Sequence, residues 1–244
     1  MNIVAKEHQI VSNEQWVARR KILLAEEKTW TRERDRLAAK RRELPWVRIE
    51  KEYKFASAGG AVTLAELFDG RSQLIVYHFM FGPEWEVGCP SCSFLADHVD
   101  GARQHFEHRD VSFCAVSRTS IEKIEAYRKR MGWKFRWVSS LANDFNFDFK
   151  VSFTDEMRAS GHVQYNFGDI GDPGIDELPG TSVFYKDSDG SIYHTYSSYA
   201  RGGEVLLGAY GFLDLVPKGR DENGPRHDMG DWLKRHDEYG ENGR

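Results

Sequence analysis

Cys89 and Cys92, separated by Pro90 and Ser91, form the motif whose residue types and spacing are best suited to chemistry. They follow an apolar run at residues 74–81 and precede a segment of helical periodicity, so the first cysteine is predicted at a helix start. Unpaired backbone N–H groups and the helix dipole favour a thiolate there. The second cysteine faces the same side of the helix, where it can close a disulfide or resolve a mixed one.

The residues around the two cysteines fit either a binding role or a structural one. Pro90 suits the first helical turn, because its missing N–H would have no partner there. Residues 82–88 separate the apolar run from the cysteines by more than a tight connection needs. Trp85, together with Phe81 and Val87, could line a substrate groove in this loop. The loop could equally only cover the edge of the core, so both interpretations stay open.

The elements that would position this motif follow one another in an alternating order. The run at 74–81 predicts a central strand covered on both faces. Helical spacing follows at 94–106, a second strand at 111–117, an amphipathic helix at 121–130 and a short strand at 135–139. This order indicates a parallel sheet with right-handed crossovers.

The C-terminal half predicts a hairpin, a helix and two irregular segments. Residues 181–186 and 191–196 flank an Asp-Ser-Asp-Gly turn and predict an antiparallel hairpin, and a helix is expected at 204–215. Residues 143–180 are polar, aromatic and glycine-rich, so we predict a long surface insertion, although it could contribute to a binding surface. From residue 217 the charged, glycine-rich sequence predicts an extended tail.

The N-terminal part predicts one long helix at residues 12–43, without Gly or Pro, capped by Ser12 with Gln15 as its partner and ending before Pro45. We expect its apolar stripe to dock on the body, with a dimer seam as the alternative. After it, 46–55 predicts a strand, Gly59 and Gly60 a turn, and 65–68 a short helix. The stripe consists of Trp16, Leu23, Trp30 and Leu37.

Composition predicts one main domain that contains a packed core. The chain has 244 residues, 40% of them hydrophobic, and 34 basic against 38 acidic residues give a formal charge of -4, which argues against a general nucleic-acid binder. The polar first eight residues lack the apolar core of a signal peptide, and the run at 74–81 is too short to span a bilayer. Three cysteines are too few for a secreted disulfide framework. We therefore expect a cytoplasmic protein without membrane contact.

Two further side chains have a structural and a functional interpretation. His78, within the first core strand, is expected to be a core histidine bonded to a neighbour, with a titratable group near the thiols as the alternative. Cys114, in the strand at 111–117, is expected to be a buried inert thiol rather than a third redox partner.

Five blocks stand in one order along the chain: Glu43-Leu44-Pro45-Trp46-Val47, Tyr77-His78-Phe79-Met80-Phe81-Gly82, Gly88-Cys89-Pro90-Ser91-Cys92-Ser93, Arg130-Met131-Gly132-Trp133 and His194-Thr195-Tyr196-Ser197. They resemble a bacterial family, domain of unknown function 899, whose members are described as predicted thioredoxin-like dithiol-disulfide oxidoreductases. The resemblance implies an α/β, thioredoxin-like three-layer fold with a central mixed β-sheet. Together with the elements predicted above, we expect an N-terminal helical extension at 1–45, a domain at 46–216 with a long insertion at about 143–180 before the last hairpin, and a tail at 217–244.

Carried over from the thioredoxin-like superfamily, Cys89 matches the attacking cysteine and Cys92 the resolving one. Thioredoxins place a cis-proline immediately before a threonine and the third core strand; here Thr181 begins that strand, but Gly180 precedes it and the proline is Pro179. The substrate-binding residues that this resemblance and the loop suggest are Trp85, Pro90, Ser91, Pro179, Gly180 and Thr181.

The peroxidase motif of peroxiredoxins is not reproduced in this sequence. Peroxiredoxins have a threonine three residues before a lone catalytic cysteine, together with a distant arginine. Glu86 occupies the threonine position here, and Arg201 is the candidate for an arginine near the site.

The leading hypothesis is a dithiol-disulfide oxidoreductase in which Cys89 attacks a substrate disulfide and Cys92 resolves the mixed disulfide. The substrate would be a disulfide-containing protein or a small thiol compound, and the electron donor is unknown. No cofactor, metal, nucleic acid or membrane is expected, and a homodimer is open. The alternatives are a binding or scaffold protein without redox turnover, a thiol peroxidase, and a zinc module in which His98 or His105 joins the cysteines.

Overall fold

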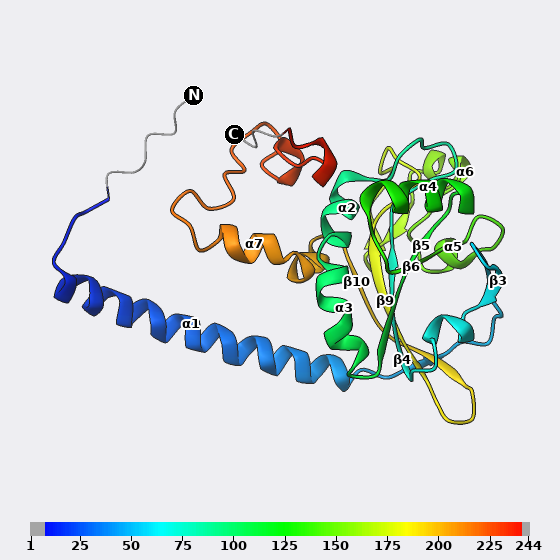
Figure 1. Ribbon diagram of the computed structural model, residues 1–244, viewed down its shortest axis with the longest axis horizontal. Coiled ribbons are helices and arrows are strands. Elements are labelled where there is room, and N and C mark those ends of the chain that lie inside the picture. The colour runs from blue at the N-terminus through cyan, green and yellow to red at the C-terminus, as the bar shows by residue number, and fades with distance from the viewer. Residues whose placement is uncertain (1–7, 241–244) are drawn as a thin grey trace. The chain divides into compact units, whose positions relative to one another are not determined.

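The computed structural model describes residues 8–240 of the chain (Figure 1). The expectation about the polar first residues therefore falls mostly outside the described residues. The chain divides into two compact units, Met1–Pro45 and Trp46–Arg244. Within the described part, none of the helices combines the length and apolar character that crossing a membrane would require.

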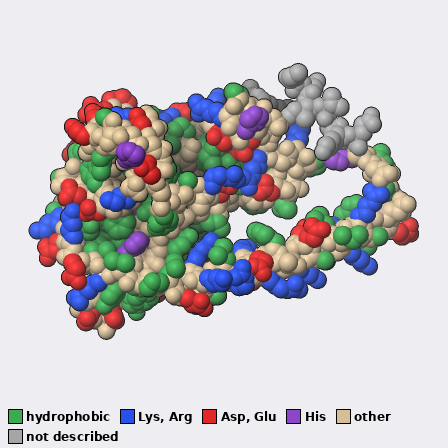
Figure 2. Space-filling view, turned by 180° about the vertical axis from the view of Figure 1, so that it is seen from behind, with side chains coloured by type: hydrophobic (Ala, Val, Ile, Leu, Met, Phe, Trp, Pro, Cys, Tyr) green, Lys and Arg blue, Asp and Glu red, His purple; other side chains and the backbone are tan. Residues whose placement is uncertain are grey.

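The first unit contains helix α1 (Asn13–Arg42), which confirms the predicted long helix. Ser12 caps it by accepting a hydrogen bond from the Gln15 N–H, and the Gln15 side chain accepts from the Ser12 N–H in return. Apolar side chains lie among charged ones along its surface (Figure 2). The four stripe residues are between 47% and 64% exposed, and their docking on the body stays a prediction.

The second unit is built on a mixed sheet that, within residues 8–240, has eight strands in the order β1-β10-β9-β4-β5-β6-β2-β3. Strand β4 runs parallel to β5 and antiparallel to β9, so that Val76 lies between Cys114 and Ser182. This arrangement confirms the expected thioredoxin-like α/β fold. The strands are β1 (Val47–Arg48), β2 (Lys54–Ser57), β3 (Gly60–Thr63), β4 (Gln73–His78), β5 (Val111–Ser117), β6 (Arg136–Ser139), β9 (Gly180–Lys186) and β10 (Ile192–Tyr199).

The sheet is covered on both faces, because successive side chains of a strand point to opposite faces and the strands carry apolar side chains on both. One face packs against α2 (Pro90–Ala96), α3 (Val99–Glu107), α4 (Ile121–Met131) and α7 (Gly208–Leu213). The other face packs against the short helix η1 (Ala65–Phe68) and α5 (Phe145–Asp148). Figure 1 shows α2 and α3 along one side of the strands.

Three predicted elements differ from the observed ones. The single helix after the cysteines is two helices, α2 and α3, separated by Asp97 and His98. The single strand at 46–55 is wrong, because β1 pairs with β10 whereas β2 pairs with β3 and β6 at the opposite edge of the sheet. Strand β4 ends at His78 rather than at residue 81, which frees the backbone of the following residues for other partners.

The prediction that residues 143–180 form a surface excursion is wrong for much of the segment. It forms α5, α6 (Asp155–Ala159), β7 (Gln164–Tyr165) and β8 (Gly168–Asp169), and part of it packs into the core. Its fully buried side chains include Phe145 and Val151. Aromatic residues at i, i+4 spacing, Phe145 and Phe149, face the sheet together, which explains why a segment without strong periodicity is nevertheless buried.

Buried charges tie this insertion to the loop before the cysteines. The Arg118 Nε donates to Glu177 Oε1 at 2.7 Å, and the Ser152 hydroxyl donates to Glu177 Oε2 at 2.6 Å. Arg118 also bonds Asp176, whose other oxygen accepts from the Trp85 indole N–H at 3.1 Å. The bond between Trp85 and Asp176 therefore holds the loop at 82–88 to the insertion.

His78 and Cys114 are structural residues, as expected. The His78 Nε2 lies 2.9 Å from the Ser182 hydroxyl, the ring stacks on Phe145 and Phe149, and burial lowers its pKa to about 3. Cys114 is fully buried, and burial raises the pKa of its thiol to about 12. It belongs to the apolar cluster across the sheet from the cluster that contains Cys92, so it is not placed to exchange with that thiol.

The predicted C-terminal helix is a 3₁₀ segment, η2 (Ala200–Leu206), followed by α7. The prediction of an extended tail is wrong for its described part, which folds back onto the domain and contains the 3₁₀ turns η3 (Met229–Asp231) and η4 (His236–Glu238). Side-chain hydrogen bonds to Asp97 and Arg130 hold it there. Residues 241–244 of the predicted tail lie outside the described residues.

If the insertion is part of the core, Phe145→Ala should lower the free energy of unfolding by about 3–5 kcal/mol, through lost burial and a residual cavity. Phe167→Ala is the matched control, because this phenylalanine of the same insertion is 83% exposed. It should change the free energy by no more than about 0.5 kcal/mol. Urea unfolding followed by tryptophan fluorescence measures both, and equal effects would contradict the assignment.

Candidate active site

The start of α2 positions both cysteines. Cys89 is the N-cap residue and Pro90 the first helical residue, as the proline's fixed φ favours. The Ser93 N–H and hydroxyl donate to the Cys89 carbonyl at 2.9 and 2.8 Å. The Cys89 N–H donates to the Met80 carbonyl at 3.1 Å, so the chain end of β4 holds the motif against the sheet.

The Cys89 thiol is partly exposed and its pKa is lowered to about 6. The hydrogen bond from the Cys92 thiol is the largest cause, and the backbone N–H groups of Cys92 and Ser91 add to it. These are donors of the first helical turn, which have no partner within the helix. A large fraction of Cys89 is therefore thiolate at neutral pH, which is the nucleophilic form.

Cys92 has the opposite environment. Its side chain is 1% exposed, and burial, followed by the interaction with Cys89, raises its pKa well above the ordinary value. The Met80 N–H donates to its sulfur at 3.4 Å, and the Tyr77 hydroxyl also hydrogen-bonds it. Cys89 is thus a partly exposed residue whose thiol has a lowered pKa, while Cys92 is buried and has a raised one.

A cavity of about 460 Å³ opens beside Cys92. Four of the residues expected to bind substrate line it together with this cysteine: Ser91, Pro179, Gly180 and Thr181. No peptide bond among residues 8–240 is cis, so the bond before Pro179 is trans. A Cβ on Gly180 would lie 2.8 Å from the Tyr199 ring, which explains why a glycine rather than a proline begins β9.

Trp85 and Pro90, the other two expected binding residues, are not among the side chains that line this cavity. Trp85 bonds Asp176 through its indole N–H, and its carbonyl accepts from the Lys123 ammonium at 3.0 Å. Trp85 therefore anchors the loop at 82–88 to Asp176 and Lys123.

The cavity also has a charged lining that the sequence interpretation missed, apart from Arg201. Arg201 donates to Glu204 at 2.6 Å, and the Tyr210 hydroxyl donates to Glu222 at 2.6 Å. The other charged lining residues are Arg226, His227 and Asp228. Most of these residues follow position 217, where the charged, glycine-rich composition indicated a tail and carried no periodicity that would reveal folding.

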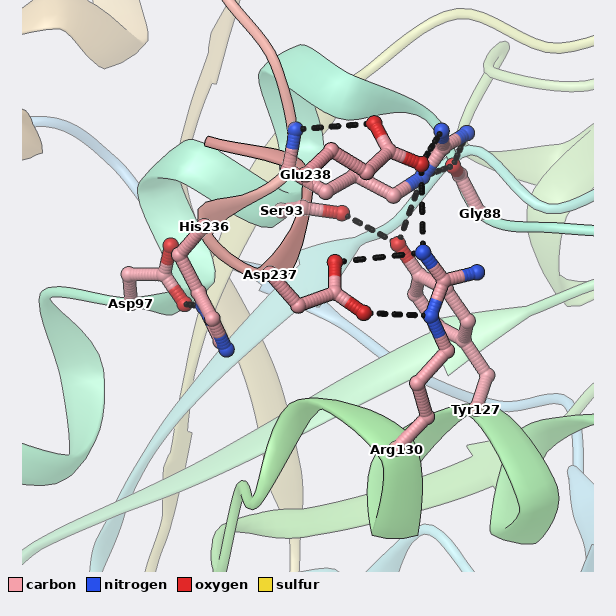
Figure 3. A network of polar contacts seen from close by, with 9 residues as sticks. Gly88, Ser93, Asp97, Tyr127, Arg130, His236, Asp237 and Glu238 are labelled. Atoms are coloured by element: carbon pink, nitrogen blue, oxygen red, sulfur yellow. Dashed lines mark hydrogen bonds and ion pairs between the residues drawn. The ribbon is translucent and has the colours of Figure 1, made fainter. Parts of the chain in front are cut away.

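Residues 229–238, here called the C-terminal strap, lie against the start of α2. The Arg235 guanidinium donates to the Gly88 carbonyl at 2.6 and 3.1 Å and to the Tyr127 hydroxyl at 2.9 Å. Tyr127 is itself 2.8 Å from the Ser93 hydroxyl, and Figure 3 shows this network around Gly88. The strap thus bonds to the residue immediately before the reactive cysteine.

The side chains that the zinc hypothesis requires are not arranged around a common point. The His98 Nδ1–H donates to the Phe94 carbonyl at 2.7 Å, and its Nε2 accepts from the Ala209 N–H at 3.0 Å, so both ring nitrogens have partners. Across residues 8–240, no group of three or more His, Cys, Asp or Glu side chains is placed to hold a metal ion.

The pKa of Cys89 should govern its reaction with iodoacetamide. We expect the alkylation rate of the reduced protein to rise with pH through a midpoint near 6, because the thiolate fraction increases through the pKa. Cys92→Ala removes the main hydrogen-bond donor and should move the midpoint upward. Cys114→Ala, across the sheet, should leave it unchanged. A midpoint near the unperturbed ~8.5 in the wild type would refute the geometry.

Comparisons with known proteins place the chain in a family. The solved structures to which the chain is similar include peroxidoxin BcpB of Mycobacterium tuberculosis (TM-score 0.46, 11% identity, 68% of this chain and 94% of that one covered). They also include peroxiredoxin Q of Xanthomonas campestris (0.44, 14%, 64% and 87%) and the mitochondrial 2-Cys peroxiredoxin of Plasmodium falciparum (0.40, 14%, 69% and 92%). No curated protein matches. A family model matches residues 5–239, and the chain therefore belongs to the family described as bacterial protein of unknown function, DUF899.

Proposed function

We propose that this protein is a dithiol-disulfide oxidoreductase that uses Cys89 as nucleophile and Cys92 as resolving thiol. The observation that carries the proposal is the unequal pair of sulfurs at the start of α2. Cys89 is partly exposed with a pKa of about 6, and Cys92 is 1% exposed with a raised pKa. An attacking thiol with a pKa near the ambient pH reacts fastest in exchange.

In the first step, the Cys89 thiolate attacks one sulfur of a substrate disulfide. A new S–S bond joins Cys89 to that sulfur, the substrate S–S bond breaks, and the other substrate half leaves as a thiolate that takes up a proton. The enzyme then carries a mixed disulfide on Cys89, two residues before Ser91 and three before Cys92 in the motif whose second half lines the cavity.

In the second step, Cys92 loses its proton and attacks the Cys89 sulfur. The mixed disulfide breaks, the second substrate half leaves as a thiolate and is protonated, and a Cys89–Cys92 disulfide remains. Hydrogen bonds from the Met80 N–H and the Tyr77 hydroxyl favour the Cys92 thiolate that must form at this point. Tyr77 and Met80 are thus positioning groups for the resolving thiol.

The cycle closes when a reductant of the thiol class returns two electrons and two protons to the enzyme disulfide. A low-molecular-weight thiol of a reducing compartment, for which we propose the cytoplasm, would supply them. The direction of net turnover then follows from the reduction potentials of substrate and reductant.

The two cysteines should give different products with hydroxyethyl disulfide. Reduced Cys92→Ser should stop at a mixed disulfide on Cys89, visible as an added mercaptoethanol by mass spectrometry and removed by dithiothreitol. Reduced wild type should end with an internal disulfide and no adduct, and Cys89→Ser should form neither product. Cys114→Ser serves as the control that behaves like the wild type. An unmodified wild-type dithiol after prolonged incubation would refute turnover and favour a binding protein.

A further inference from the structure

The C-terminal strap is bonded directly beside Cys89. Its Arg235 donates two hydrogen bonds to the carbonyl of Gly88, the residue before this cysteine. Through Tyr127 and Ser93 the same guanidinium connects to the Cys89 carbonyl, which accepts from the Ser93 hydroxyl. The strap is therefore linked to the backbone on the N-terminal side of Cys89 and, through two side chains, to the carbonyl of Cys89 itself.

Apolar side chains of the strap add to this cover. Met229 and Trp232 pack at the edge of the same apolar cluster as Cys89. The Trp232 ring lies 5.8 Å from that of Phe94 on α2, in an edge-on arrangement. Met229 also lines the cavity together with Ser91. The strap thus borders the cavity while leaving Cys89 itself partly exposed.

The remaining attachments of the strap are polar and lie near the surface. Arg130 of α4 bonds Asp237 at 2.6 and 3.1 Å and Glu238 at 3.1 Å, and the His236 Nδ1 lies 2.7 Å from Asp97 (Figure 3). Ion pairs of this kind contribute little each. The strap has only short 3₁₀ turns and no long helix or strand of its own. A segment held in this way belongs to the parts of a protein that open at lowest cost.

We infer that the C-terminal strap is a size filter, held closed by Arg235, which admits low-molecular-weight disulfides to Cys89 and excludes protein disulfides. The inference rests on the proposed oxidoreductase function and specifies its substrate class. A small disulfide would pass beside the strap to Cys89, which is partly exposed. A protein disulfide carries polypeptide on both sides of its sulfurs, and that polypeptide would overlap the strap where it bonds Gly88.

The test compares a small and a large disulfide on the same reduced, full-length proteins. Rates of oxidation by hydroxyethyl disulfide and by insulin are measured for wild type, Arg235→Ala and Arg235→Lys. Arg130→Gln, which removes the hydrogen bonds to Asp237 and Glu238, is a second variant with an intact Arg235. Arg128→Ala is the matched control, because this arginine of α4 pairs with Glu125 and not with the strap.

We expect wild type and Arg128→Ala to react with hydroxyethyl disulfide much faster than with insulin. Arg235→Ala should raise the insulin rate by at least about tenfold, the population shift that follows from losing one charge-assisted hydrogen bond. Arg130→Gln should raise the insulin rate by a smaller factor. Arg235→Lys should give an intermediate insulin rate, because lysine keeps the positive charge but lacks the planar guanidinium group with its several donors. Alkylation by a maleimide on a long polyethylene glycol chain should follow the insulin rates, and alkylation by iodoacetamide should stay at the wild-type rate and verify the fold.

The outcomes separate the two ideas. If the wild type reacts with hydroxyethyl disulfide but the insulin rate is as fast, or is the same in Arg235→Ala and Arg130→Gln as in the wild type, the filter is wrong and the oxidoreductase stands. If no variant reacts with either disulfide while Cys89 is still alkylated, the proposed function itself fails.

Discussion

The interaction on which the site depends is the hydrogen bond between the two thiols of the motif. Burial keeps the proton on Cys92, and that proton stabilises the negative charge on Cys89. The same arrangement of atoms therefore lowers the pKa of Cys89 and raises that of Cys92. Because Cys92 is surrounded by apolar groups and cannot ionise alone, its proton is available to its neighbour until a mixed disulfide removes the charge that it stabilises.

Met80 supplies the backbone that holds this pair in place. Its carbonyl accepts from the Cys89 N–H and its N–H donates to the Cys92 sulfur. Both groups are available because β4 ends two residues earlier, at His78. The short strand is thus a condition for the site: a strand that continued to residue 81 would use these groups in the sheet ladder.

Access to the pair is decided by segments that are far from it in sequence. The start of β9 forms one wall of the cavity at Gly180, and residues beyond position 217 form another. The strap reaches the Gly88 carbonyl across 147 residues of chain. The two thiols and the walls of the cavity therefore come from parts of the chain that are far apart in sequence.

Local patterns in the sequence determined the elements that have strong periodicity or distinct caps. Strand β5 and helices α1 and α4 lie where their apolar spacing and, for α1, the cap Ser12 predict them. Position at a helix start also indicated the reactive character of Cys89, because the unpaired N–H groups of a first turn are a local property.

The tertiary structure alone decided what depends on contacts distant in sequence. Burial of the insertion arises from aromatic side chains that meet the sheet only after folding, such as Phe145, and composition could not distinguish it from a surface loop. The strap is held by Arg235 and Arg130 across more than a hundred residues, and a charged stretch carries no sign of its partners. Sequence by itself therefore determined the position of the two cysteines at a helix start and the main helices and strands, while the cavity, its charges and its cover followed from packing, because long-range contacts leave no local period to detect.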